Sequence, residues 1–219
     1  MEYLVKIVVS ILGFIGSNHI SLFGVDIPLV NKGSGLYEGG NNSYVYKGAN
    51  PNNYISFNNE IWRIMDINND WIKIIKKDSI GDMAFDKDDS NEWKESSLYE
   101  YLNDDYYDTL DPRYKKIVNG DIKIMSMEDY IQANSNLKLC GSLDLYFRND
   151  AKCFKTNYIN GTSWTLTKEE DTVFYVGNTY FNDIRPSDSS FGVLPVLYLD
   201  KNIKLYGKGT LQNPYKIVF

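Results

Sequence analysis

Histidine and cysteine are almost absent from this sequence. His19 is the single histidine in 219 residues, and Cys140 and Cys153 are the only two cysteines. Histidine is the commonest general base and the commonest metal ligand in proteins, so most hydrolase and zinc-enzyme mechanisms have no residue to carry them. We therefore expect no metal site and no cofactor, and we expect His19 to be structural or solvated.

Basic charge is also scarce. Lys and Arg number 23 against 29 Asp and Glu, which gives a net charge of -6, and no run of basic residues interrupts that balance. Proteins that bind nucleic acids hold the phosphates with clustered Lys and Arg, so we expect no nucleic-acid partner. Aromatic residues are abundant instead, at 15% of the chain with 18 Tyr, which favours strands and recognition surfaces.

A long hydrophobic run is missing too. The apolar residues 7–16, IVVSILGFIG, follow Lys6 but are shorter than the ~20 residues of a membrane span and closer to the core of a signal peptide. Two interpretations stay open: an export signal or membrane anchor within residues 1–30, or a buried strand or helix of a cytosolic protein. Gly, Ser and Lys dominate residues 32–40, which predicts a linker. We expect a signal or anchor segment with its linker at 1–34 and one domain at 35–219.

The two cysteines lie thirteen residues apart, with no CxxC pair or neighbouring histidine to complete a metal site. A disulfide between Cys140 and Cys153 is the favoured interpretation, and closing such a loop contributes roughly 3 kcal/mol. The alternative is a pair of buried thiols in a reducing compartment.

Periodicity and turn residues predict the order of the elements. Strand-like runs at 44–46, 54–57, 61–67 and 71–75 are separated by Asn-rich turns. Helix-start signatures follow at Ser97, Asp111 and Ser126. Strand-like runs return at 163–166, 172–176, 193–199, 203–206 and 215–218. This order predicts an α+β fold, with an antiparallel sheet and short helices packed to one side of it.

A series of segments in a particular order carries a family resemblance. In chain order they are GLYEGGNNSYVYKGANPNNYISFNNEIWRIMDI, SIGDMAFD, NEWKESSLYEYLNDDYYDTL, IMSMEDYIQANSNLKLCG, SWTLT, FGVLPVLYLDKNIKL and GKGTLQNPYKI. Together they resemble a family of bacterial cell-surface and exported proteins that is classed as a domain of unknown function. The resemblance covers about residues 35–217 and implies a domain displayed outside the cell, but it transfers no activity.

A weaker resemblance concerns the fold. The segment Gly192-Val193-Leu194-Pro195-Val196 is similar to a late strand of the C-type-lectin-like fold shared with formylglycine-generating enzymes, in which Arg often stands at the position of Leu194. This resemblance implies a C-type-lectin-like domain.

Two acidic clusters are candidates for chemistry. Carboxylates and amides at Asp86, Asp88, Asp89, Asn91 and Glu92 have the spacing of a calcium loop, but they fail the EF-hand pattern, so a solvated acidic loop is the favoured interpretation. Carboxylates at Asp104, Asp105 and Asp108 lie beside tyrosines, as in some glycoside hydrolases. Helical spacing explains them more simply and is the favoured interpretation, with the aromatic side chains inward and the carboxylates outward.

The segment between Trp164 and Phe191 combines Tyr with Asn, Ser and Asp, a composition typical of recognition loops. We predict that it binds a protein or glycan ligand without catalysis, at the surface of a bacterial cell or outside it. The predicted ligand-binding residues are Tyr175, Asn178, Tyr180, Phe181, Asp183 and Arg185. A core position for Trp164 and Tyr175 is the alternative at the residue level. At the level of function, the alternatives are a carbohydrate-active hydrolase with paired carboxylates and a structural, pilus-like subunit.

Overall fold

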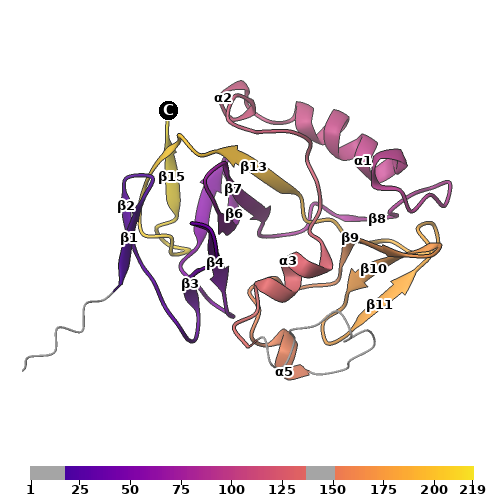
Figure 1. The fold of residues 1–219 in the computed structure, drawn as a ribbon. Helices are drawn as coiled ribbons and strands as arrows, with labels where there is room; N and C mark the ends of the chain where they lie inside the picture. Colours follow the sequence, from indigo (N-terminus) through magenta and orange to yellow (C-terminus); the bar gives the residue numbers. More distant parts are fainter. Residues whose placement is uncertain (1–17, 137–150) are drawn as a thin grey trace, which may run out of the picture.

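The computed structural model describes residues 18–136 and 151–219 (Figure 1). Strands come first along the chain, helices follow, and strands return, which confirms the predicted α+β class. The two larger sheets are mixed rather than purely antiparallel, because each contains one parallel pair. In Figure 1 the larger sheet occupies the left half of the molecule and the smaller sheet the right half.

The larger sheet has eight strands and contains most of the strands of the N-terminal half of the chain. Its main path runs β13-β7-β6-β5-β15-β14, and β4 joins β6 to β3. The strands are β3 (Gly35–Glu38), β4 (Tyr44–Lys47), β5 (Tyr54–Phe57), β6 (Glu60–Ile67), β7 (Trp71–Lys76), β13 (Val196–Asp200), β14 (Lys204–Tyr206) and β15 (Tyr215–Val218).

Local chemistry explains the hairpin between β5 and β6. Asn58 and Asn59 both adopt positive φ, at 52° and 61°, while Phe57 pairs directly with Glu60. Two residues with positive φ form the type of turn whose twist matches a two-residue hairpin, and Asn tolerates this conformation well. The turn predicted at these two asparagines is confirmed.

The predicted strand at 193–199 is shorter than expected. β13 begins at Val196, directly after Pro195, which has no backbone N–H to donate. The Pro195 carbonyl still accepts a hydrogen bond from the Lys76 amide at 2.9 Å. From Val196 onward, β13 pairs with β7 over its full length, from Val196 opposite Ile75 to Asp200 opposite Trp71.

The smaller sheet has five strands in the order β11-β10-β9-β12-β8. They are β8 (Asp82–Met83), β9 (Ser163–Glu169), β10 (Thr172–Val176), β11 (Phe181–Ile184) and β12 (Phe191–Gly192). Trp164 on β9 is 1% exposed, and its indole N–H donates to the Met83 carbonyl at 2.7 Å. Its core position, one of the two sequence interpretations, is thereby confirmed.

Short helices connect the two groups of strands. They are the 3-10 helix η1 (Trp93–Glu95), α1 (Ser97–Tyr101), the π-helix η2 (Leu102–Tyr106), α2 (Pro112–Lys115), α3 (Met127–Gln132) and α5 (Ala151–Phe154).

Two of the three predicted helix starts are confirmed. The Asp111 side chain caps α2 with proline at its first position, and Ser126 forms a capping box with Asp129 at the start of α3. The third prediction was wrong by one residue, because Ser96 rather than Ser97 caps α1 by accepting from the Tyr99 amide at 3.1 Å. Ser97 instead contacts the preceding loop, where its amide donates to Asp86 Oδ1 at 2.7 Å.

A hairpin of β1 (His19–Leu22) and β2 (Val25–Pro28) precedes the larger sheet. Ile27 is 3% exposed and belongs to the core, and the Leu205 amide donates to the Phe23 carbonyl at 2.8 Å. The packed part of the chain thus includes residues of the 1–34 segment, which the sequence alone assigned to a signal or anchor and its linker. His19 has a structural partner here, because its Nδ1 lies 2.7 Å from Asp26 Oδ2.

Several sequence predictions fall on residues outside the described ranges. The hydrophobic run at 7–16 and Cys140 both lie there, so the signal or anchor and the disulfide stay predictions; Cys153 is 2% exposed. Among the described residues, no helix is long and apolar enough to cross a membrane.

Candidate functional site

The six predicted ligand-binding residues lie on or near the β10–β11 hairpin, but they do not share one exposed face. Tyr175 and Phe181 are 7% and 3% exposed, and the Tyr175 ring stacks on Phe191 with centroids 4.0 Å apart. β10 is buried along most of its length because β9 and β11 flank it and the core covers it. Both side chains belong to the core, so the surface role predicted for them is corrected, and for Tyr175 the alternative core position holds.

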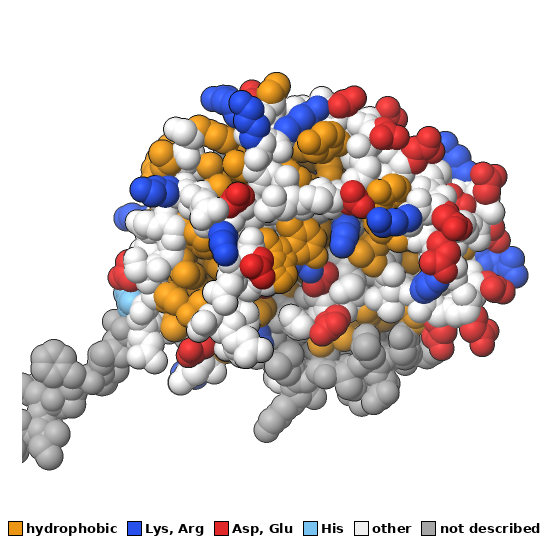
Figure 2. Space-filling view, turned by 45° about the horizontal axis from the view of Figure 1, so that its top comes forward, with side chains coloured by type: hydrophobic (Ala, Val, Ile, Leu, Met, Phe, Trp, Pro, Cys, Tyr) orange, Lys and Arg blue, Asp and Glu red, His pale blue; other side chains and the backbone are white. Residues whose placement is uncertain are grey.

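The other predicted residues remain accessible, although Asp183 and Arg185 are occupied by local contacts. Asp183 accepts a hydrogen bond from Thr172 Oγ1 at 2.6 Å, and Arg185 pairs with Asp89 at 3.2 Å. Tyr180 is 40% exposed, and Asn178 is exposed beside it. Figure 2 shows many charged side chains on the right-hand part of the displayed face, where the smaller sheet and α1 lie. This surface is polar and charged, and it offers few free aromatic faces to a ligand.

The acidic loop before α1 is held together by its own backbone. Asp86 is 3% exposed, and its carboxylate accepts from the amides of Asp88, Ser90 and Ser97 at 2.7–2.9 Å. Burial raises the pKa of Asp86, but these backbone donors outweigh it and hold the pKa below its usual value. Within residues 18–136 and 151–219, no three His, Cys, Asp or Glu side chains group closely enough to hold a metal ion.

The carboxylates considered for glycoside hydrolysis face solvent. Asp104, Asp105 and Asp108 are all exposed, and Asp108 pairs with Lys115 at 3.0 Å. Their aromatic neighbour Tyr106 points inward and is 8% exposed. The arrangement is that of a helix with an apolar inner face and an acidic outer face, as the simpler sequence interpretation stated.

A more favourable site lies on the larger sheet, at its β13 edge. Trp71 on β7 and Tyr198 on β13 are both half-buried, and their rings stack with centroids 5.6 Å apart and planes at 25°. They line an open cleft of about 440 Å³, which we call the Trp71–Tyr198 cleft. Its lining residues are Asp70, Trp71, Asn119, Gly120, Asp121, Lys123 and Tyr198.

Strand pairing builds this cleft. Tyr198 lies opposite Lys73 in the β7–β13 register, and Trp71 lies two residues before Lys73 on the same strand, so both rings stand on one face of the sheet. The other wall comes from the segment after α2, which follows the outer edge of β13. Bridges pair Val118 with Leu199 and Lys123 with Val196, and they place Asn119, Gly120 and Asp121 beside Tyr198.

A buried ion pair lies next to the Tyr198 ring. The Lys73 ammonium is 2.5 Å from Asp129 Oδ1 and 5.4 Å from the centre of the Tyr198 ring. The other carboxylate oxygen of Asp129 accepts from the Ser126 amide at 2.8 Å, within the capping box of α3. Burial lowers the pKa of Lys73, but attraction to Asp129 outweighs it and keeps the pKa raised. The ring therefore rests beside a fixed cation.

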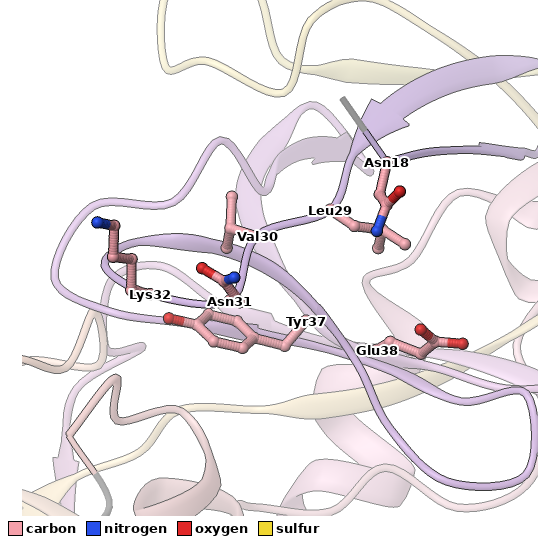
Figure 3. Close-up of a pocket in the computed structure, with 7 residues that line it drawn as sticks. All are labelled: Asn18, Leu29, Val30, Asn31, Lys32, Tyr37 and Glu38. Atoms are coloured by element: carbon pink, nitrogen blue, oxygen red, sulfur yellow. The ribbon is translucent and has the colours of Figure 1, made fainter. Parts of the chain in front are cut away.

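A larger hollow, of about 640 Å³, lies between the N-terminal hairpin and β3 (Figure 3). Lys32 and Glu38 lie at its opposite ends, with Tyr37 and Asn31 between them. The Tyr37 hydroxyl already donates to the Gly33 carbonyl at 2.7 Å. Because this hollow holds one aromatic side chain and borders Asn18, the first described residue, it is a weaker candidate than the Trp71–Tyr198 cleft.

Sequence reasoning missed the Trp71–Tyr198 cleft. Trp71 and Tyr198 were each assigned to a strand, and the composition of neither strand distinguishes it from other strands of the core. The cleft can be recognised only once β7 is paired with β13, and this pairing joins distant parts of the chain.

Comparisons with known proteins add no assignment, because no protein-family model, no curated protein and no solved structure matches this chain.

Proposed function

We propose that this protein is a non-catalytic recognition domain that binds a saccharide in the Trp71–Tyr198 cleft. The observation that carries the proposal is the stacked, half-exposed ring pair in an open cleft. The flat, C–H-bearing face of a sugar ring packs on aromatic rings, while its hydroxyl groups need donors and acceptors at the rim. Few polar groups around an apolar, aromatic floor are typical of small-molecule sites.

The polar residues of the cleft suit hydroxyl groups. Asp70 and Asp121 supply acceptors, Lys123 supplies donors, and the Asn119 side chain supplies both. A saccharide fits this mixture better than the protein ligand that the sequence also allowed, because the cleft is small and its charges have both signs.

A C-type-lectin-like architecture and a location outside a bacterial cell are parts of the same proposal. In support of the fold, the last strand, β15, lies parallel to the early strand β5 within one sheet. Leu194, which stands where the lectin-like motif often has Arg, is 4% exposed and packs in the core. Support for the location comes from the sequence resemblance and the apolar run at residues 7–16.

The test is a glycan array followed by titration of the full-length protein with the saccharides that bind, observed by tryptophan fluorescence. Trp71→Ala and Tyr198→Ala each remove one ring of the stack, and we expect each to weaken binding about tenfold or more. Tyr206→Ala is the matched control, because Tyr206 is 54% exposed on β14 and outside the cleft. Circular dichroism checks that all three variants fold.

Two results would contradict the proposal. One is that no saccharide binds, or that both cleft variants bind as tightly as the wild type does. The other is release of shortened saccharides during incubation, which would show catalysis and would direct attention to Asp70 and Asp121.

A further inference from the structure

The charges of the Trp71–Tyr198 cleft are unequally paired. Asp121 lies 3.6 Å from the Lys94 ammonium and accepts from the Tyr99 hydroxyl at 3.1 Å. Asp70 lies 4.0 Å from the Lys201 ammonium. Each cleft carboxylate thus has a lysine partner from outside the cleft, and these exposed pairs offset charge although each adds little stability.

Lys123 is the exception. Within the part of the chain that the structure describes, no carboxylate oxygen lies within 4 Å of its ammonium group, and its close contact is the Tyr198 ring, 5.5 Å from the ammonium to the ring centre. The side chain is half-buried, so part of its hydration is already lost. An ammonium group in this situation gains more from an anionic partner than a fully solvated lysine does.

The backbone holds Lys123 firmly in place. Its amide donates to the Val196 carbonyl at 3.0 Å, and its carbonyl accepts from the Val196 amide at 2.7 Å. This two-way bridge fixes the segment to β13, two residues from Tyr198. The main chain that carries the ammonium group is therefore already fixed beside the cleft and need not be ordered when a ligand binds.

The surroundings of the Tyr198 ring also favour an anionic ligand near Lys123. The ammonium groups of Lys73 and Lys123 both lie within 5.5 Å of its centre. Lys73 is neutralised by Asp129 at 2.5 Å, whereas Lys123 is not neutralised by any carboxylate of the described residues. The positive charge of the cleft is thus concentrated at its Lys123 side.

We infer that the saccharide bound in the Trp71–Tyr198 cleft carries an anionic group, a carboxylate or a sulfate, which Lys123 binds while the sugar ring packs on Trp71 and Tyr198. This inference rests on the proposed function and names its ligand class, an acidic saccharide. It assigns Lys123 as the residue that determines specificity between acidic and neutral sugars.

The experiment compares matched ligands that differ only in charge. The carboxylate arm uses tetragalacturonate against its neutral methyl ester. The sulfate arm uses 6′-sulfated lactose against lactose. For the full-length protein, we expect at least one acidic ligand to bind about tenfold more tightly than its neutral counterpart, and the arm that responds identifies the anionic group.

Variants then connect the preference to Lys123. Lys123→Met keeps the aliphatic length and removes the charge, so we expect it to abolish the tenfold preference while binding of the neutral ligand changes less than threefold. Lys123→Arg keeps the charge and should keep the preference. Lys116→Met is the matched control, because Lys116 is an exposed lysine of the preceding segment that does not line the cleft.

The preference for acidic saccharides and saccharide binding itself can fail separately. If neutral and acidic saccharides bind equally, or if Lys123→Met keeps the preference, the inference is wrong while saccharide binding stands. If no ligand of either kind binds, the proposed function fails and the inference fails with it.

Discussion

A half-buried acid on β6, Asp66, makes the stability of this domain depend on pH in an unusual direction. Asp66 lies opposite Lys73 in the β6–β7 register. Burial raises the pKa of Asp66 from 3.8 to about 6, attraction to Lys73 opposes this increase, and repulsion from Asp129 adds to it. Near neutral pH the folded protein therefore holds an ionised carboxylate in a position that disfavours it.

The sign of the effect follows from proton binding. Between about pH 4 and pH 6, Asp66 holds its proton in the folded state and has lost it in the unfolded state. The free energy of unfolding therefore falls as the pH rises through this window. A pKa shift from 3.8 to about 6 corresponds to roughly 3 kcal/mol, which is the maximum cost of ionising Asp66 above pH 6.

Asp66→Asn should remove this cost, because the amide resembles the protonated acid in shape and never ionises. Lys73 keeps its partner Asp129 at 2.5 Å, so the variant leaves no unpaired buried ammonium group. We expect the variant to be about 1–3 kcal/mol more stable than the wild type at pH 8, and the two proteins to be nearly equal near pH 4.

Urea unfolding followed by tryptophan fluorescence at pH 4, 6 and 8 measures this difference. Other carboxylates titrate in the same range, but they are common to both proteins and cancel in the comparison. Asp171→Asn changes an exposed carboxylate and serves as the control, with an expected change below about 0.5 kcal/mol at each pH. The destabilising effect of ionised Asp66 is refuted if Asp66→Asn destabilises the protein at pH 8, or if the effect of the substitution does not change with pH.

Two further predictions concern stability. Arg63 is 5% exposed, lies between the Tyr54 and Tyr158 rings at 4.0 and 4.7 Å, and donates to Asn53 Oδ1 at 2.6 Å. Arg63→Met leaves that amide oxygen without its donor, and chemical denaturation should show a loss of about 2–4 kcal/mol; the exposed Arg113→Met should change stability by less than about 0.5 kcal/mol, and equal losses would refute the role of burial. Gly209 has a φ of +68°, and a Cβ there would lie 2.4 Å from the Asn52 carbonyl oxygen. Gly209→Ala should therefore lower the free energy of unfolding by about 1–3 kcal/mol. Gly40→Ala, where a Cβ meets no atom within 4 Å, should be nearly neutral, and a thermal melt that ranks the two glycine variants in the opposite order would contradict this account.

The parts of the fold that could be predicted from sequence are those that local chemistry determines. The Asn58-Asn59 turn, the Asp111-Pro112 helix start and the Ser126 capping box depend on residues a few positions apart, and each is present in the structure. The error at Ser97 arises because Ser96 and Ser97 are adjacent and both accept hydrogen bonds from backbone amides. Only the position of the preceding loop decides which serine caps the helix.

The candidate site could not be predicted, because tertiary pairing creates it. Trp71 and Tyr198 read as ordinary strand residues until β7 and β13 are placed side by side. Conversely, the composition around Tyr175 resembles a recognition surface, although β10 lies between two strands and its tyrosine is 7% exposed. Composition reports which residues suit a surface, whereas burial depends on strand order, which the local sequence does not contain.

β15 pairs in parallel with β5, with Tyr215 opposite Ile55 and Lys216 opposite Ser56. This pairing affects how the newly synthesised chain folds. β15 is synthesised long after β5 and lies between β5 and β14, so the larger sheet stays incomplete until residues 215–218 have left the ribosome. Contacts between such distant segments form slowly. The nascent chain should therefore stay incompletely folded and accessible to chaperones for longer than a protein whose sheet is built from neighbouring hairpins.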